Sequence, residues 1–418
     1  MQMFQGNNLS SQMEKQIPAG LVEFMQEAGL VAAGLGQKIY LVGGMVRDLL
    51  LERSNLDLDL VVAGDAIDLA RQLAGITGAR MTTHPHFHTA NLRWQKQSID
   101  LTSARSETYS RPGALPTVRP GALDIDLFRR DFTINTLAIE LIPNRWGEII
   151  DLYGGRDDLE KGLLRVLHEG SFIDDATRIW RGLRYEQRLN FKLEPKTLRL
   201  LKRDVPMLET ISNDRIRHEL ELVLAEAFPE KVIIRADKLK VLAELHPALK
   251  GDTWLARKFN QARRQTSPGP PPVGLYFALL AYRLTPDQNE KLISWLRLSK
   301  SHSLTLRDTI RLKAGLELLA EPGLAPGRIY SALRDYAAPA LTTNHLATDS
   351  STVKRHIRLY QNKLRHVRPA LTGDDLQKMG ISPGPRMKEI LHQLLQAKLD
   401  GQVTDKHGEV EMVEEKTR

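Results

Sequence analysis

A short segment at residues 39–62 constrains the fold of this chain more than any other, because it places two glycines between two apolar runs. Residues 39–42 are apolar, Gly43 and Gly44 follow them, and a helical stretch begins near Arg47. A glycine pair lets the backbone approach an anion closely, and a helix N-terminus attracts negative charge. The segment therefore predicts a strand, a phosphate-binding turn and a helix, in that order.

The second apolar run, residues 56–62, carries Asp57 and Asp59 in alternation with leucines. Residues two apart on a strand point the same way, so both carboxylates leave one face. Adjacent carboxylates repel each other unless a cation lies between them, and Mg²⁺ completed by water and phosphate oxygens suits such a pair. A D-x-D pattern alone is usually a solvated strand edge. Together with the Gly-Gly turn and Arg47 it favours a site for a metal-bound nucleoside triphosphate, although neither the P-loop nor the dinucleotide-binding glycine pattern occurs.

The composition narrows the class of protein. A chain of 418 residues is long enough for more than one compact unit. The lack of cysteine excludes disulfides and thiolate metal sites and suits the reducing cytoplasm. No apolar run approaches the ~20 residues of a membrane helix, and the start lacks the segments of a secretory signal. We therefore expect a cytoplasmic protein without a membrane span, and the net charge of +8 favours a polyanionic partner.

The spacing of apolar residues separates a mixed N-terminal region from a helical remainder. Residues 1–18 are polar and are expected to be loose. Beyond residue 155 the spacing is helical almost throughout, with breaks at 266–274 and 320–327. The expected strands are residues 39–42, 56–62, 89–93, 98–101 and 149–152. The expected fold class is thus α+β.

Histidines and one aspartate fall on or near the expected strands. His84, His86 and His88 could ligate a metal, but no spaced carboxylate completes such a site, so an exposed strand or turn is the preferred interpretation. Asp100 either orients a metal and activates a hydroxyl group, or is an ordinary residue at a strand end. The Gly- and Pro-rich segment 108–123 has the length of a loop that covers an active site.

Residues 127–141 are predicted to form an apolar helix with charged residues near its start. Arg129 and Arg130 beside a triphosphate would neutralise the charge that moves to the departing pyrophosphate. Asn135, one helical turn beyond Asp131, could bind a ribose or hold an arginine in place. In isolation Arg-Arg-Asp at a helix start is usually a capping feature, but the preceding D-x-D favours the nucleotide site.

A further helix is expected around residues 172–184. Its apolar face consists of Phe172, Ala176, Ile179 and Leu183. The charged residues off that face are Asp175, Arg178, Arg181 and Arg184. Asp175 and Arg178 are one turn apart and can act together, either as a surface ion pair or as a pair that reads a base.

The pair of Asp175 and Arg178 has the chemistry of a base template. A carboxylate only accepts hydrogen bonds, and a guanidinium only donates them. Cytosine and adenine present an amino donor beside a ring-nitrogen acceptor, whereas uracil and guanine present a carbonyl beside an N–H. An Asp and an Arg that face this edge would accept C and A and reject U and G.

Five segments, in this order, resemble the motifs of a known family. They are GGMVRD with DLD, RRDFTINTLA, DLYGGRDDL, DDATRIWRGLRY and NDRIRHEL. The series is similar to that of class II tRNA nucleotidyltransferases, which are the CCA-adding enzymes and their bacterial poly(A) polymerase relatives. The resemblance is dense over residues 25–225 and resumes at 371–401.

The resemblance implies a polymerase-β-like nucleotidyltransferase head, followed by all-α neck, body and tail domains that hold the acceptor arm and elbow of tRNA. The implied boundaries are 19–153 for the head, 154–225 for the neck, 226–325 for the body and 326–418 for the tail. The implied activity is addition of the 3′-terminal CCA to tRNA from CTP and ATP with Mg²⁺, with release of pyrophosphate. No required protein partner is evident.

The resemblance also implies roles for residues. Asp57 and Asp59 would bind the catalytic Mg²⁺ ions, and Asp100 falls where some members carry a third carboxylate. Residues 108–116 fall on the family's flexible loop, which is associated with the switch to A addition. The expected nucleotide-binding residues are Gly43, Gly44, Arg47, Arg129, Arg130, Asp131, Asn135, Asp175, Arg178, Arg181 and Arg184.

The chain departs from the family pattern at two positions, Asp174, where Glu is usual, and Thr136, where Ala is usual. Neither departure removes the template pair. The remaining alternatives are an enzyme that adds only A or only CC, a poly(A) polymerase, and a catalytically silent RNA-binding protein. The loop with Tyr109, Pro112 and Gly113 disfavours addition of CC alone, and the retained D-x-D disfavours a silent protein.

A basic helical stretch, residues 353–368, is either a solvated helix face or a contact to the tRNA backbone. In the second case the affinity for tRNA would fall with salt. The cations are Lys354, Arg355, Arg358, Lys363, Arg365 and Arg368.

Overall fold

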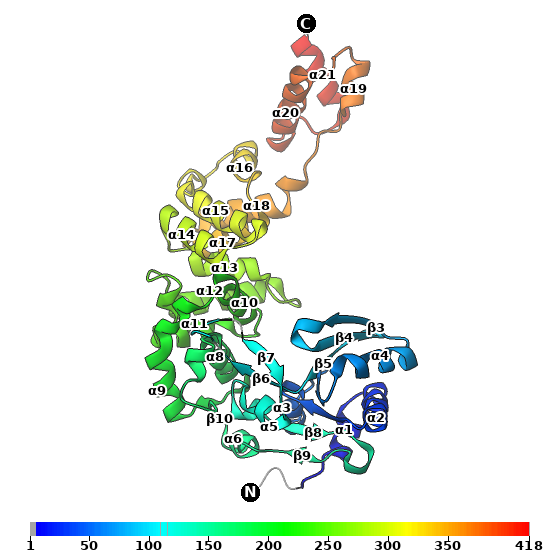
Figure 1. The fold of residues 1–418 in the computed structure, drawn as a ribbon. Helices are drawn as coiled ribbons and strands as arrows, with labels where there is room; N and C mark the ends of the chain where they lie inside the picture. Colours follow the sequence, from blue (N-terminus) through cyan, green and yellow to red (C-terminus); the bar gives the residue numbers. More distant parts are fainter. Residues whose placement is uncertain (1–5, 109, 115, 418) are drawn as a thin grey trace. The chain divides into compact units, whose positions relative to one another are not determined.

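The computed structural model describes residues 6–108, 110–114 and 116–417, with side chains up to residue 415. The chain forms two compact units: Met1–Leu220 with Leu239–Glu244, and Glu221–Lys238 with Leu245–Arg418. The first unit contains a large β-sheet, and the second unit is helical throughout its described residues (Figure 1). The expected α+β class is confirmed, whereas the expected boundaries of head, neck, body and tail stay predictions.

The centre of the first unit is a mixed sheet of seven strands. They are β1 (Lys38–Val42), β2 (Leu58–Ala63), β3 (Arg80–His84), β4 (Thr89–Trp94), β5 (Gln97–Ser103), β8 (Ala138–Glu140) and β9 (Ile149–Ile150). Their order is β3-β4-β5-β2-β1-β8-β9, and only β2 and β5 run parallel among these neighbours. All five strands expected from the sequence are present, with ends shifted by up to two residues.

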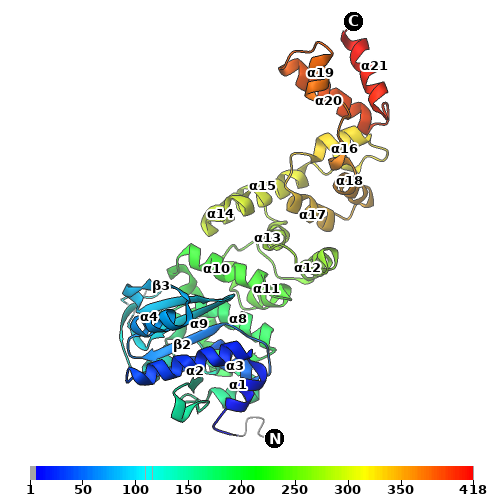
Figure 2. The ribbon, with the colours of Figure 1, turned by 90° about the vertical axis from the view of Figure 1, so that its right-hand side faces the viewer.

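The sheet explains why the two apolar runs are strands. β1 lies between β2 and β8, and four of its five residues are buried, as expected for a central strand. In β2, Leu58 and Leu60 are buried, and Asp59 between them points to the opposite side. The helices α2 (Ala19–Gly34) and α4 (Ala66–Thr77) pack on each other and on the sheet, as Figures 1 and 2 show.

Shorter elements complete the first unit. They are α1 (Ser10–Gln16), α3 (Gly44–Leu50), β6 (Arg105–Thr108), β7 (Thr117–Pro120), α5 (Leu123–Phe128), α6 (Gly155–Lys161), β10 (Leu163–Leu164), α7 (Ser171–Asp174), α8 (Thr177–Leu189), β11 (Lys192–Leu193), α9 (Pro195–Asp204) and α10 (Asn213–Leu224), whose end belongs to the second unit. The prediction that residues 1–18 are loose is wrong for α1, because Met13 is fully buried and fixes this helix against the unit. The loop residue Tyr109 lies outside the described residues.

The helix expected over residues 127–141 is wrong. α5 ends at its start, a single 3₁₀ turn (Thr133–Asn135) follows, and β8 then joins the sheet beside β1. The apolar residues after the turn are completely buried, and a short, fully buried strand has no polar alternation that would distinguish it from a helix. The segment forms a strand because it pairs with β1.

The helix expected around residues 172–184 is interrupted. Its apolar face is confirmed, because Phe172, Ala176, Ile179 and Leu183 are fully buried. However, α7 ends before Asp175, whose backbone is extended (φ −142°, ψ 96°), and α8 begins after it. The histidines near residue 86 lie where β3 ends and in a short 3₁₀ turn (Pro85–Phe87), so the preferred interpretation of a strand or turn is confirmed.

The second unit is a series of helices. After α10 these are α11 (Pro229–Lys238), α12 (Thr253–Thr266), α13 (Val273–Ala281), α14 (Pro286–Leu296), α15 (Lys300–Ala314), α16 (Pro326–Leu333), α17 (Ala338–Ala347), α18 (Ser351–Asn362), α19 (Gly373–Lys378), α20 (Pro385–Leu399) and α21 (Lys406–Thr417). The apolar core of residues 312–364 is distinct from that of residues 371–413, although Leu399 of α20 joins the former. Within the described part of the chain, no helix is long and apolar enough to cross a membrane.

Candidate active site

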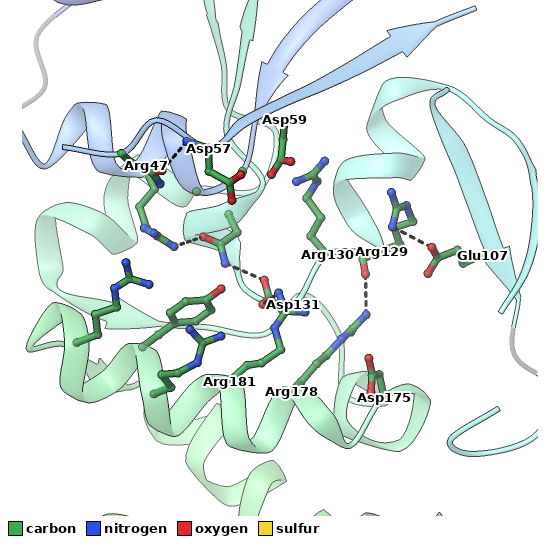
Figure 3. A pocket seen from close by; sticks show the side chains of 17 residues that line it. Arg47, Asp57, Asp59, Glu107, Arg129, Arg130, Asp131, Asp175, Arg178 and Arg181 are labelled. Carbon is green, nitrogen blue, oxygen red and sulfur yellow. Dashed lines mark hydrogen bonds and ion pairs between the residues drawn. The ribbon is translucent and has the colours of Figure 1, made fainter. Parts of the chain in front are cut away.

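A cavity of about 520 Å³ in the first unit brings together most of the residues that the sequence singled out. Figure 3 shows Asp57 and Asp59 on one side of it and Arg178 and Arg181 of α8 on the other. The lining residues are Gly43, Gly44, Arg47, Asn55, Asp57, Asp59, Glu107, Arg129, Arg130, Asp131, Asn135, Asp175, Arg178, Arg181, Arg184, Tyr185 and Arg188. Every expected nucleotide-binding residue is in this set, and Asp100 is not.

The two carboxylates of the D-x-D pattern form the acidic side of the cavity. Asp57 directly precedes β2, and Asp59 is its second residue. Burial raises the pKa of Asp59 to about 6, and the negative charge of Asp57 adds to this effect, while Arg130 opposes it. A bound divalent cation would remove this repulsion and hold both groups ionised.

The donor set fits a hard divalent cation of the Mg²⁺ type. Among the described residues, no group of three or more His, Asp or Glu side chains is placed to hold a metal. Mg²⁺ is commonly bound by one or two carboxylates, with water and substrate phosphates in its remaining positions. Asp57 and Asp59 could thus supply all the ligands that such a site needs from the protein.

Asp100 lies next to Asp59 without lining the cavity. The two residues are direct partners across the parallel strands β2 and β5. The Asp100 side chain is exposed and accepts a hydrogen bond from Asn91 Nδ2 at 2.8 Å. It contributes to the raised pKa of Asp59, and its catalytic role stays a prediction.

Gly43 lets two charged side chains meet at the turn between β1 and α3. Its φ of 73° is in the left-handed region that favours glycine. A Cβ atom at this position would lie 3.0 Å from Nη1 of Arg130 and 3.8 Å from Oδ2 of Asp59. The nearest neighbours of Gly43 are thus the acidic and basic groups of the site, and the approach of a phosphate to the Gly-Gly turn stays a prediction.

Arg47 is held by a chain of hydrogen bonds that crosses the cavity floor. Its guanidinium is buried and donates to both carboxylate oxygens of Asp48 at 2.8 Å. Nη1 of Arg47 donates to Asn135 Oδ1 at 2.8 Å, and Nδ2 of Asn135 donates to Asp131 Oδ1 at 2.8 Å. Arg181 Nη2 completes the chain with an ion pair to Asp131 Oδ2 at 2.6 Å. Asn135 thus holds Arg47, and not an arginine of the Arg-Arg-Asp segment as expected, while its role toward a ribose stays a prediction.

The charge of Asp131 is stabilised although the residue is buried. Burial alone would raise the pKa of Asp131, but Arg181, the hydrogen bond from Asn135 and the charge of Arg178 together hold this pKa below its usual value. The same interaction raises the pKa of Arg181. This pair therefore remains ionised at neutral pH and fixes α8 against the segment that follows α5.

Two carboxylates that the sequence did not single out position the adjacent arginines. Asp126 is fully buried and forms ion pairs with Arg129 at 2.7 Å and with Arg130 at 3.2 Å. Glu107 of β6 pairs with Arg129 at 2.9 Å. Burial lowers the pKa of Arg130, and Asp126 opposes this effect. Glu107 has no local pattern, because it contacts Arg129 only after the hairpin of β6 and β7 packs beside α5. Asp126 lies three and four residues before Arg129 and Arg130, a helical spacing that could have identified it.

The expected template residues are close, but they do not pair with each other. Arg178 Nη1 donates to Ser171 Oγ and Nη2 donates to the Arg129 carbonyl, both at 2.6 Å. Both oxygens of Asp175 instead accept from Arg215 Nη2 at 2.9 Å. The surface ion pair that the spacing allowed is therefore absent from the described contacts, and each residue has its own support.

Aromatic and basic residues of α8 extend the site beyond the expected set. The Tyr185 ring lies 5.3 Å from the guanidinium carbon of Arg47 and 5.2 Å from that of Arg184, which is within cation–π range. Arg188 lines the cavity one turn further along α8. The spacing from Arg181 to Tyr185 and Arg188 is i, i+4 and i+7, so helical periodicity could have identified both.

Two family models match the chain. One, described as the poly A polymerase head domain, matches residues 39–165. The other, described as the probable RNA and SrmB-binding site of polymerase A, matches residues 190–252. The first match includes the D-x-D carboxylates and the arginines that follow α5.

The chain is also similar to characterised proteins over nearly its whole length. An A-adding tRNA nucleotidyltransferase of Halalkalibacterium halodurans is 31% identical and aligns with 99% of this chain and 96% of its own. That of Geobacter sulfurreducens is 34% identical over 95% of this chain, which spans only 47% of that relative's length. A solved structure of the Thermotoga maritima CCA-adding enzyme complexed with tRNA matches with a TM-score of 0.79, 28% identity, and coverage of 98% and 99% of the two chains.

Proposed function

The chain belongs to the class II tRNA nucleotidyltransferase family, and from this premise we propose that it adds the terminal adenosine to the 3′ end of tRNA, with ATP as donor. The observation that carries the proposal is the cavity in which Asp57 and Asp59 face several arginines, with Asp175 also in its lining. The choice of A is supported by the two A-adding relatives, which exceed 30% identity over nearly all of this chain. The 3′-hydroxyl attacks the α-phosphate and pyrophosphate leaves.

Nucleotidyltransferases of this family use a divalent metal, and we assign Mg²⁺ to Asp57 and Asp59. When bound there, the metal neutralises phosphate oxygens and favours ionisation of the attacking hydroxyl. Asp59 of β2 and Asp57, directly before this strand, would hold the metal. Burial and the negative charge of Asp57 raise the pKa of Asp59. A cation bound between the two carboxylates would offset this repulsion, and this favours metal binding at the pair.

The arginines bind the triphosphate and stabilise the charge that develops on pyrophosphate. Arg47 and Arg130 lie on either side of the glycine turn, and each is already oriented by a carboxylate, Asp48 or Asp126. Because these side chains are held before the substrate arrives, little reorganisation is needed in the transition state. Gly43 has no side chain, so the Arg130 guanidinium lies directly beside the turn.

Base choice falls to Asp175 and Arg178. The carboxylate of Asp175 accepts from the exocyclic amino group of adenine, and Arg178 donates to the adjacent ring nitrogen. Uracil and guanine would present a carbonyl to the carboxylate and an N–H to the guanidinium, which leaves both groups unpaired. The same logic admits cytosine.

Complete CCA addition is the second candidate, because the T. maritima CCA-adding enzyme is similar over 98% of this chain. The template pair has no feature that excludes CTP. Both candidates share the final step, transfer of A to tRNA that ends in CC.

The basic segment of the second unit is proposed to contact the tRNA backbone. Arg355 and Arg358 of α18 are exposed, whereas Val353 and Ile357 of the same helix are buried. The expected helical stretch over 353–368 is wrong beyond Asn362, where α18 ends, and the exposed Lys363, Arg365 and Arg368 follow it. Exposed cations without a carboxylate partner suit phosphate contacts. The cytoplasmic location and the lack of a required protein partner stay predictions.

The test uses one tRNA that ends at the discriminator base and one that ends in CC, each with labelled ATP, CTP or both. Extension of only the CC-ended tRNA, by one A, is the expected result. Growth of the first tRNA by CCA would establish the second candidate. No incorporation into either tRNA by the intact protein, with Asp59→Ala as the inactive control, would contradict both.

A further inference from the structure

One face of the sheet in the first unit is exposed along β3, β4 and β5. Helix α4 lies on the other face of these strands, where Leu92 and Ile99 are buried (Figure 1). Trp94 also points to that side, since its ring lies 5.2 Å from the ring of Phe24 in α2. The side chains that alternate with these residues form the open sheet face. Its exposed or partly exposed members include Arg80, Thr82, His84, Asn91, Arg93, Ser98 and Asp100.

The strand register makes the open sheet face continuous with Asp59. Asp59 is the partner of Asp100 across β2 and β5, and Asp100 is the partner of Asn91 across β5 and β4. The hydrogen bond from Asn91 Nδ2 to Asp100 Oδ1 at 2.8 Å confirms that these two side chains share a face. Arg93 lies two residues beyond Asn91 and therefore on the same face, at a distance of two strands, or about 10 Å, from β2. The open sheet face thus begins beside the acidic side of the cavity.

Arg80 and Arg93 lie directly opposite each other on this face. They are partners across the antiparallel strands β3 and β4, both are exposed, and their described contacts include no carboxylate. Like charges in this arrangement repel each other and destabilise a strand pair. A charge on an edge strand such as β3 can serve to prevent pairing with another chain. Arg93 is on β4, between β3 and β5, so protection of the edge does not explain it.

The proposed reaction requires the RNA to arrive from the side of β2 where these strands lie. In-line displacement places the attacking and leaving oxygens on opposite sides of the phosphorus. The glycine turn and Arg47, which bind the triphosphate in the proposed function, follow β1 on one side of β2. Strands β5, β4 and β3 lie on the other side of β2 in the sheet order. The 3′-hydroxyl and the nucleotides behind it therefore approach over the open sheet face.

We propose that the open sheet face binds the 3′ strand of the tRNA acceptor end, and that Arg80 and Arg93 contact its phosphates. This inference rests on the proposed function and adds a surface of the first unit to the basic segment of the second. Charge complementarity supports an RNA strand as the occupant. Asp100 is the only carboxylate in β3, β4 and β5, and an anionic backbone would offset the repulsion between the two arginines. Because phosphate contacts carry no sequence information, the contact should be independent of tRNA sequence.

The first experiment measures the affinity for tRNA that ends in CC at several salt concentrations, without nucleotide, so that the result does not depend on catalysis. Arg93→Gln should weaken binding a few-fold and reduce the slope of log affinity against log salt by about 1, and Arg80→Gln should act in the same direction. Arg93→Lys keeps the charge and should keep the slope. Arg71→Gln is the matched control, because Arg71 is exposed on α4, which covers the other face, and pairs with Asp68. It should match the intact protein.

A second experiment identifies the RNA strand that Arg93 contacts. Single phosphates near the 3′ end of the tRNA are replaced by neutral methylphosphonates. At one of these linkages the loss of affinity should not add to that of Arg93→Gln, because either change removes the same contact. Full additivity at every linkage of the 3′ strand would overturn the proposed occupant.

The remaining outcomes separate the inference from a structural role. If the arginines only protect the sheet edge, Arg80→Gln and Arg93→Gln would self-associate in light scattering and leave the salt slope unchanged, which would overturn the inference. An equal loss of affinity in Arg71→Gln would overturn it as well. Thermal denaturation should be the same for all variants, and if Arg93→Gln does not fold, Arg80→Gln decides by the same measurement. Failure of the intact protein to incorporate ATP would overturn the proposed function, whereas an unchanged slope with normal incorporation would overturn this inference alone.

Discussion

Four aspartates in and beside the cavity form two groups with different surroundings. Asp126 and Asp131 are buried and form ion pairs with arginines. Asp57 and Asp59 form no ion pair with a cationic side chain in the described contacts, and burial with mutual repulsion raises the pKa of Asp59. The paired group positions arginines of the protein, and under the proposed function the unpaired group binds a cation from solution.

This difference separates carboxylates that stabilise the fold from carboxylates that take part in the reaction. Removal of a paired carboxylate leaves an arginine buried without its partner and so destabilises the fold. Removal of an unpaired one relieves repulsion and costs function instead. The same division applies to the arginines: Arg181 is paired with Asp131, whereas Arg178 has only neutral partners.

The largest expected effect is on the unpaired group. Asp59→Ala should lower kcat for A addition by at least about 10³-fold, because half of the protein's share of the metal site is lost. Single-turnover incorporation measures the loss, and a filter-binding assay should show unchanged tRNA affinity. Asp68→Ala, which removes an exposed carboxylate paired with Arg71, serves as the control. Near-normal turnover by Asp59→Ala would contradict the proposal that Asp57 and Asp59 bind the catalytic metal.

In the paired group, Asp131→Asn should lower the stability of the fold. The free energy of unfolding should fall by about 3 kcal/mol at pH 7, at the low end for a broken buried ion pair because Arg181 is partly exposed. Since folding lowers the pKa of Asp131, its contribution is present above the unfolded pKa of about 4 and is lost as the pH falls through the folded value.

Urea denaturation at several pH values measures this contribution. The difference between the intact protein and Asp131→Asn should be constant from about pH 5 to pH 8 and should shrink below about pH 4. Asp124→Asn, at an exposed position of α5, is the control and should have no comparable effect. A difference that grows on acidification would contradict the paired state of Asp131.

Arg178→Ala tests the arginine without a carboxylate partner. Selection of ATP over GTP should fall by about 10- to 100-fold, because the donor half of the template is lost while the metal site remains. The kcat/KM ratio of the two nucleotides measures this, with Arg199→Ala of α9 as an exposed control. Unchanged selection would exclude Arg178 as a template residue.

The smallest effect is expected in the second unit at Arg358, an exposed arginine for which the described contacts include no carboxylate. Arg358→Ala should weaken tRNA binding a few-fold and reduce the slope of log affinity against log salt by about 1. Arg334→Ala, whose arginine lies 3.6 Å from Asp335, is the comparison and should leave the slope unchanged. Equal slopes for Arg358→Ala and the intact protein would show that α18 presents an ordinary solvated face and does not contact tRNA through Arg358.

Much of the head could be predicted because its signals are local. Strands β1 and β2, the glycine turn between them and the side of β2 that carries Asp59 follow from apolar runs, glycine conformations and the two-residue period. The apolar face around Phe172 follows from helical spacing in the same way. For these elements the deciding interactions lie within a few residues of each other.

The failures come from contacts between distant segments. The stretch after Asp131 is a turn and a strand because β1 offers a partner, and a strand buried on all sides has no alternation to reveal it. Glu107 and Arg215 were missed for the same reason: each is an ordinary charged residue until packing brings it within 2.9 Å of its partner. Asp126 is different, because its pairs with Arg129 and Arg130 have helical spacing and could have been identified.

The sequence by itself therefore determined which chemical groups the site contains, because residue type and local spacing settle the donors, acceptors and charges. Only the tertiary structure decided which of them are committed to one another. Asp175 and Arg178 are one helical turn apart in sequence, yet α10 supplies the partner of the first and Ser171 with the Arg129 carbonyl the partners of the second. The pairing of charges depends on distances between elements, and these distances are properties of the packed core.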